Sequence, residues 1–285
     1  MMQISPKQKK ILFFLLQNKR MSSSQIYTAL QAAGEDISLV TVKRTLSELL
    51  ETGIAAAIGA GRATRYEVAA LGRIFANLDA KEYCAIEPDK RWGLSRYNFD
   101  LFSSLPSNLF TASEQQILQA ATAEYQRRTI DISPGLKKKE MERLVIELSW
   151  KSSKIEGNTY TLLDTEKLIL ENQEAPGHDK NEGRMILNHK DAFNFVYENA
   201  AEFATLTKAN VEKLHAILVK DLSVRLGFRD KPVGVLGSKY QPLDNIHQIT
   251  DAMSALGLVV ARMETPYSQA LAALLGISYI QPFED

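Results

Sequence analysis

The 285-residue chain has little cysteine and no net charge, and both shortages exclude classes of protein. Its single cysteine, Cys84, excludes an internal disulfide and fits a reducing compartment, although any chain poor in cysteine would look the same. Its 34 basic and 34 acidic residues cancel, so the chain as a whole has no field that would attract nucleic acid. No stretch reaches the roughly 18 uninterrupted apolar residues of a membrane span.

The first residues also lack a targeting signal. Lysines are scattered through them, with no long apolar run and no cleavage site of small residues. We therefore expect a cytoplasmic protein without membrane contact. With 45% hydrophobic and 24% charged residues, the chain has an ordinary soluble composition and enough length for two cores.

The N-terminal part carries three helix-start signals followed by a hairpin pattern. Ser5 and Ser22 each precede a Gln by three residues, which is the spacing of a capping box, and Ser38 precedes a third amphipathic stretch. Two short runs of strand character then flank a glycine-rich turn at residues 59–61. Three helices and a two-stranded wing predict a winged helix-turn-helix domain over residues 1–70.

This segment has nine basic and five acidic residues, a net charge of +4 in an otherwise neutral chain. A winged helix can bind duplex DNA with its third helix in the major groove and its wing on the phosphates. The residues expected at these contacts are Thr41, Lys43, Arg44, Arg62 and Arg65. Alternatively, the domain serves dimerisation or docking and its charges are merely solvated; the sequence leaves both interpretations open.

The rest of the chain predicts a connecting segment and a helical domain. Residues 71–110 are rich in aromatic side chains, which favours a segment packed on the helical domain, since a flexible linker would be polar. Helical patterns fill residues 111–285, including an amphipathic helix that turns Ile155 toward the core and an apolar helix at 271–280 expected to be buried on all sides. The expected fold is mainly α: a winged helix-turn-helix, then an all-α bundle with a short β-hairpin.

Two short motifs in this helical region resemble the Fic (Fic/Doc, Fido) family. Residues 281–285, Gln-Pro-Phe-Glu-Asp, are similar to the opening of its signature, His-Pro-Phe-x-(Asp/Glu)-Gly-Asn-(Gly/Lys)-Arg. Residues 152–157, Ser-Ser-Lys-Ile-Glu-Gly, are similar to its inhibitory motif, (Ser/Thr)-x-x-x-Glu-(Gly/Asn). Weaker similarities follow in the family's order at residues 182–192, 213–218, 227–229 and 233–243. The resemblance spans residues 111–285 and implies a Fic domain that is incomplete at its C-terminus.

The resemblance implies AMP transfer from ATP to a hydroxyl of an unknown target protein, with Mg²⁺ as cofactor. Gln281 then stands where the family has its catalytic His, Phe283 at its core anchor and Asp285 at its Mg²⁺ ligand. The inhibitory motif maps to Ser152, Glu156 and Gly157, and the hairpin flap that docks the target maps to Val235, Gly237 and Tyr240. Without the resemblance, Glu156 is an exposed carboxylate beside a helix-ending glycine.

The motif also predicts a loss of activity. An amide cannot take up a proton near neutral pH, so Gln281 cannot act as a general base, and losing one costs about 10² to 10⁴ in rate. The phosphate-binding glycines of the signature are missing as well. We expect an autoinhibited adenylyltransferase that is inactive as this chain stands, which leaves its status as an enzyme open. Either the sequence is disrupted, or it is a degenerate relative kept for binding.

Two other functions stay open at this point. One is a DNA-binding transcriptional regulator whose degenerate Fic domain senses a ligand or mediates homodimer formation. The other is a different transfer chemistry, because relatives in the family can move phosphate or phosphocholine.

Overall fold

The computed structural model of the chain describes residues 4–74, 76, 78–235 and 237–284. The chain divides into two compact units. The first comprises Met1–Thr111, Val233–Pro242 and Met263–Ser268, and the second comprises Ala112–Pro232, Leu243–Arg262 and Gln269–Asp285.

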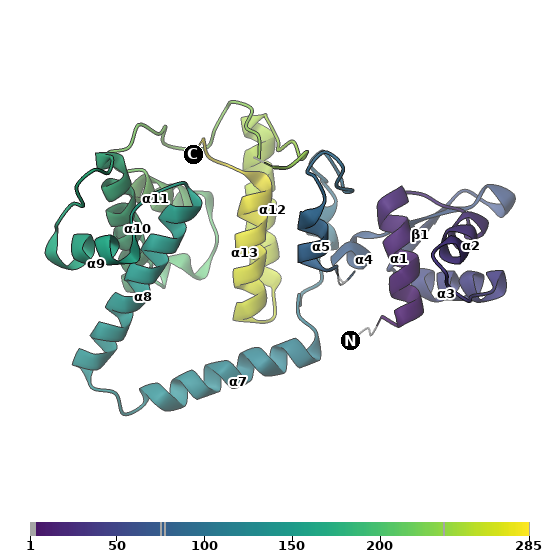
Figure 1. Cartoon of the computed structure of the whole chain (residues 1–285), viewed down its shortest axis with the longest axis horizontal. Coiled ribbons are helices and arrows are strands. Elements are labelled where there is room, and N and C mark those ends of the chain that lie inside the picture. Colours follow the sequence, from purple (N-terminus) through teal and green to yellow (C-terminus); the bar gives the residue numbers. More distant parts are fainter. Residues whose placement is uncertain (1–3, 75, 77, 236, 285) are drawn as a thin grey trace. The chain divides into compact units, whose positions relative to one another are not determined.

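The first unit opens with three helices and a hairpin (Figure 1). The elements are α1 (Pro6–Asn18), α2 (Ser23–Ala32), α3 (Leu39–Glu51), β1 (Ala55–Ile58) and β2 (Arg65–Val68). The two strands are antiparallel, and a 3₁₀ turn at Gly61–Ala63 lies between them. This arrangement confirms the predicted winged helix-turn-helix. The short helices α4 (Ala70–Ile74), α5 (Ala80–Ala85) and α6 (Leu101–Ser104) follow.

The predicted helix starts owe their positions to side-chain caps. Ser5 accepts a hydrogen bond from the backbone of Gln8, whose side chain accepts one from the backbone of Ser5. Ser22 and Gln25 repeat the same capping box at α2. The caps satisfy backbone N–H groups that a helix start leaves without partners. They hold the helices around a core that includes Ile11, Leu12, Leu15, Ile26, Leu30, Val42, Leu46, Leu49 and Ile54.

The second unit is built from helices. Its elements are α7 (Ala112–Thr129), α8 (Pro134–Ile155), α9 (Leu162–Glu171), α10 (Lys180–Glu198), a 3₁₀ turn at Glu202–Ala204, α11 (Lys208–Leu218), α12 (Ile246–Arg262) and most of α13 (Pro266–Ile280). Helix α10 packs against α8 and α11, and α9 packs against α8. Among the helices described here, none is both long and apolar enough to span a membrane.

Two burial predictions in this unit are wrong. Ile155 is 83% exposed, because the buried side of α8 passes through Val145, Ser149 and Ser153. A residue two positions beyond Ser153 is rotated by about 200° around the helix and therefore faces away from that side. On α13, Leu274 and Leu275 are 64% and 57% exposed, so this helix is not buried on all sides.

The predicted flap hairpin at residues 233–243 is also wrong. The described residues of this stretch form no paired strands, and Gln241 instead makes an isolated parallel bridge with Arg96. Pro232 directly precedes the stretch and Pro242 lies within it, and neither has a backbone N–H to donate to a strand partner. Val235, Gly237 and Tyr240, assigned to the flap, therefore lie in irregular chain.

Candidate nucleic-acid interface

Helix α3 presents a polar face above a buried one. Its buried side chains are Val42, Thr45, Leu46 and Leu49. Lys43 and Arg44 are exposed, as the sequence predicted. The third candidate on this helix, Thr41, is half-buried, and its hydroxyl lies 2.9 Å from the hydroxyl of Ser38, the N-cap residue. Thr41 thus contributes to the cap of α3, whereas the two cations are free to face a ligand.

Arg44 makes only a weak contact within its own helix. Its Nε lies 3.9 Å from Glu48 Oε1, and both side chains are largely exposed. Such a pair contributes about 0.3–0.5 kcal/mol. A phosphate or a guanine edge can therefore compete for this guanidinium at little cost.

An apolar residue that the sequence reasoning missed stands beside the two cations. Val40, the second residue of α3, is 77% exposed. Single exposed apolar side chains are ordinary on protein surfaces, but those that enter the major groove contact the methyl group of thymine. The helical period of the sequence could have predicted the exposure of Val40, because this residue falls outside the buried side of α3 formed by Val42, Leu46 and Leu49.

The wing carries the other two predicted cations. Arg62 is exposed in the turn between the strands, and Arg65 begins β2 half-buried, with Nη1 donating to the carbonyl of Thr64 at 3.2 Å. The turn depends on Gly59, whose φ is +83° and whose added Cβ would lie 3.1 Å from the carbonyl oxygen of Ala63. The structure therefore brings Arg62 and Arg65 onto the same wing.

The residues assigned to the catalytic and inhibitory motifs meet only in part. In the second unit, Glu156, Gln281 and Phe283 line one cavity of about 310 Å³, together with His215. Ser152 and Gly157 do not line it. Asp285, the predicted Mg²⁺ ligand, lies outside the described residues. Where side chains are described, no group of three or more His, Cys, Asp or Glu could hold a metal ion.

Hydrogen bonding and packing explain the positions of Gln281 and Phe283. Gln281 ends α13 with a φ of +50°, and its side-chain amide donates to the carbonyl of Ser278 at 2.8 Å. Phe283 stacks on His215, with ring centroids 3.8 Å apart, and meets Phe228 edge-on at 5.5 Å. Gln281 therefore caps a helix and Phe283, half-buried, packs against two aromatic rings, and neither role needs reaction chemistry.

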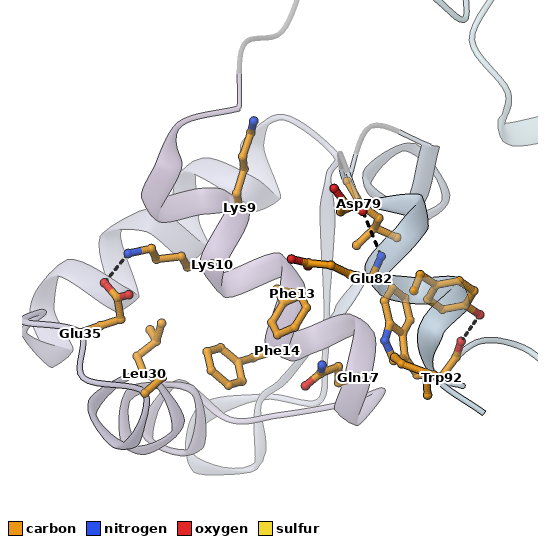
Figure 2. Close-up of a pocket in the computed structure, with 15 residues that line it drawn as sticks. Lys9, Lys10, Phe13, Phe14, Gln17, Leu30, Glu35, Asp79, Glu82 and Trp92 are labelled. Atoms are coloured by element: carbon orange, nitrogen blue, oxygen red, sulfur yellow. Dashed lines mark hydrogen bonds and ion pairs between the residues drawn. The ribbon is translucent and has the colours of Figure 1, made fainter. Parts of the chain in front are cut away.

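A separate cavity of about 520 Å³ lies within the first unit (Figure 2). It is bordered by α1, the end of α2 and the segment around α5. Its walls are mostly apolar and include Phe13, Phe14, Leu30, Ile86 and Trp92. Sequence patterns could not predict this cavity, because its lining comes from three separate segments.

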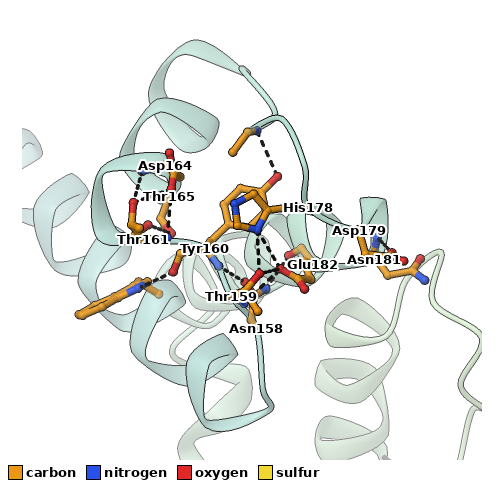
Figure 3. A network of polar contacts seen from close by, with 12 residues as sticks. Asn158, Thr159, Tyr160, Thr161, Asp164, Thr165, His178, Asp179, Asn181 and Glu182 are labelled. Atoms are coloured by element: carbon orange, nitrogen blue, oxygen red, sulfur yellow. Dashed lines mark hydrogen bonds and ion pairs between the residues drawn. The ribbon is translucent and has the colours of Figure 1, made fainter.

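A polar network in the second unit joins the chain before α9 to α10 (Figure 3). The Thr159 hydroxyl donates to Glu182 Oε2 at 2.7 Å, and His178 Nδ1 lies 2.8 Å from the same hydroxyl and 3.3 Å from Glu182 Oε2. These hydrogen bonds, the one from Thr159 foremost, hold the pKa of Glu182 below its usual range. Both His178 contacts use the same ring nitrogen, so the three groups form no relay from nucleophile to base to acid.

Comparison with known proteins bears on the first unit. Residues 1–80 match the family model described as FUR, the Ferric uptake regulator family. No curated protein matches the chain. No Fic family model matches any part of the sequence, so the Fic interpretation is wrong, and with it AMP transfer as the main function.

The Fic interpretation failed because its motifs are short. Each motif has five or six residues, and Phe283 is accounted for by its stacking on His215. ATP and Mg²⁺, expected from the same resemblance, stay a prediction that no observation supports. What the match and the fold support together is a winged helix over residues 1–80, similar to a family of DNA-binding regulators.

Proposed function

We propose that this chain is a DNA-binding transcriptional regulator. Helix α3 enters the major groove, with Lys43 and Arg44 at base edges and phosphates and Val40 against thymine methyl groups. Arg62 and Arg65 on the wing bind the flanking phosphates. The observation that carries the proposal is the outward face of α3, whose exposed side chains stand on a winged helix that matches the regulator family.

The second unit serves ligand sensing or dimerisation in this proposal. A homodimer places two copies of α3 on half-sites about 34 Å apart, one turn of the duplex, and makes the preferred site a palindrome. A chain that binds as a monomer selects a single half-site.

The proposal is tested by selecting duplexes from a random library with the full chain. We expect an enriched sequence, and we expect the Lys43→Ala/Arg44→Ala double variant to bind it about ten-fold more weakly or worse, because each lost phosphate or base contact removes about 1 kcal/mol or more. The matched control is Lys137→Ala/Lys138→Ala, which removes the same charge from exposed positions on α8.

Two results contradict the proposal. One is a library from which no sequence is enriched. The other is an equal loss of affinity in the double variant and in the control, which identifies a general charge effect. Either result favours the alternative that the winged helix is a docking module.

A further inference from the structure

The cavity of the first unit is built by the winged helix together with the chain that follows it. Helix α1 supplies one wall, and residues between Ala76 and Trp92 supply the opposite wall. Ala76 belongs to the winged-helix core, and Trp92 packs against that core. The two walls are therefore parts of one packed body. The volume of about 520 Å³ falls within the range of about 300–1,000 Å³ that is typical of small-molecule sites.

Aromatic rings line the cavity, and packing fixes two of them. The rings of Tyr83 and Trp92 meet edge-on with centroids 5.0 Å apart, and the Tyr83 hydroxyl donates to the carbonyl of Trp92 at 2.7 Å. On the opposite wall Phe13 is 44% exposed. A large apolar ring left open to solvent in a concave site gains free energy when a ligand covers it.

The charges around the cavity are not equivalent. Lys10 is paired with Glu35 at 2.5 Å, and Lys9 points away from the cavity in Figure 2. The Asp79 carboxylate caps α5 by accepting from the backbone of Lys81 and Glu82. Among the lining residues, Lys10 is thus paired and the ammonium of Lys9 faces outward. Arg91 does not line the cavity, but its guanidinium lies 5.9 Å from the centroid of the Tyr83 ring, so the rings of Phe13 and Trp92 are the ones left for a ligand.

Glu82 is the charged group aimed at the aromatic walls. Glu82 is exposed, and Figure 2 shows its carboxylate reaching from α5 toward α1, across the cavity that Glu82 and Phe13 both line. Its side chain makes no hydrogen bond or ion pair with any of the residues described. The cavity thus combines a carboxylate without a dedicated partner with the rings of Phe13, Tyr83 and Trp92.

From this combination we infer that the cavity binds an organic cation with an apolar body, such as a quaternary ammonium or phosphonium ion. Ring faces attract a cation through the negative face of their π-systems, and the attraction grows when water is excluded. Glu82 supplies the opposite charge, whereas an anion of the same shape is repelled by that carboxylate, and the ammonium of Lys9 is turned away from the rings.

The position of the site gives a bound cation access to the DNA-reading helix. Leu30 and Ala33 at the end of α2, and Glu35 in the connection to α3, line the cavity. A ligand there contacts the chain that leads into α3. Binding of the cation does not depend on DNA binding, so the cation site can be disproved while DNA binding is confirmed, and the reverse.

Tetraphenylphosphonium and tetraphenylborate test the inference, because the two ions have nearly the same size and shape and opposite charge. The chain has two tryptophans, so in the full chain with Trp150→Phe only Trp92 reports binding through its fluorescence. We expect saturable binding of the phosphonium, about ten-fold or more tighter than the borate, which corresponds to one good cation contact. The Trp92 indole N–H resonance of the unsubstituted, ¹⁵N-labelled chain provides the same readout without a substitution.

Two variants localise the effect. Glu82→Gln keeps the shape of the side chain and should reduce the preference for the cation to about three-fold or less, and Phe13→Ala should weaken phosphonium binding about ten-fold. The matched control is Glu87→Gln, since Glu87 is paired with Lys90 and does not line the cavity. The inference is overturned if the borate binds as tightly as the phosphonium, if neither ion affects Trp92, or if Glu82→Gln leaves the preference unchanged.

Discussion

Gly72 lets α4 pack directly on the base of the wing, and replacing it with alanine measures how tight that packing is. A Cβ at this position would lie 2.2 Å from the carbonyl oxygen of Ile54 and 2.8 Å from side-chain carbons of Ile54 and Val68. The Ile54 carbonyl cannot move aside freely, because it accepts a hydrogen bond from the backbone of Ala69 at 2.9 Å. The added methyl must therefore displace α4 or the end of the wing.

The magnitude follows from two opposing effects. Overpacking of this kind costs about 1–3 kcal/mol, whereas alanine improves on glycine in a helix by about 0.8–1 kcal/mol. The nearest atom is a backbone oxygen at 2.2 Å, which puts the overpacking in the upper part of its range, about 2–3 kcal/mol. We therefore expect Gly72→Ala to destabilise the first unit by about 1–2 kcal/mol. With a urea dependence of about 1–3 kcal/mol per molar, the midpoint should fall by about 0.3–2 M.

The assay uses one tryptophan for each unit. Trp92 packs on the core of the first unit, so urea unfolding of a Trp150→Phe background reports on that unit. The matched substitution is Gly135→Ala in α8, because a Cβ at Gly135 meets nothing within 4 Å. Its unfolding is followed through Trp150 in a Trp92→Phe background. We expect Gly135→Ala to raise its midpoint. A Gly72→Ala midpoint that is unchanged or higher refutes the close approach of α4 to Ile54.

Two further predictions concern the second unit. Arg229 is fully buried and donates hydrogen bonds to the carbonyls of Lys231, Leu243, Ile280 and Gln281. Arg229→Met should therefore lower the free energy of unfolding, followed through Trp150, by about 3 kcal/mol or more. A decrease below about 1 kcal/mol contradicts this role of Arg229. Because Thr159 lowers the pKa of Glu182, that contact should stabilise the unit above the unfolded pKa of a glutamate, about 4.3, and the stabilisation should be lost as the pH falls through the lower folded pKa. Thr159→Val should therefore flatten the dependence of unfolding free energy on pH between 6 and 2, which denaturant titrations measure, and an unchanged curve counts against the contact.

Local signals in the sequence were sufficient to predict the winged helix. Ser5 and Ser22 act through residues three positions away, so their capping boxes could be predicted without knowledge of the tertiary structure. The strand pairing at 55–58 and 65–68 is also local, since one short turn joins the two strands. Lys43 and Arg44 could be placed outward because the buried residues of α3 repeat with the helical period.

Features that depend on contacts between distant segments could not be predicted. The burial of Arg229 depends on carbonyls up to 52 positions away, and nothing in its own neighbourhood indicates them. Ile155 was placed on the wrong side of α8 because the helix contains enough apolar residues for two different faces. The Fic interpretation had the same weakness, since it relied on short motifs without the contacts that give Phe283 its role in packing.

The salt dependence of duplex binding by the full chain tests the central claim most directly. If Arg62 and Arg65 each hold a phosphate, each contributes a slope of about 0.9 in log K against log salt, so Arg62→Ala/Arg65→Ala should flatten the dependence by up to about two units. The Lys137→Ala/Lys138→Ala control on α8 should leave the slope unchanged. An absence of duplex binding at low salt, or a slope that does not change when both wing arginines are removed, contradicts the assignment of this winged helix to DNA.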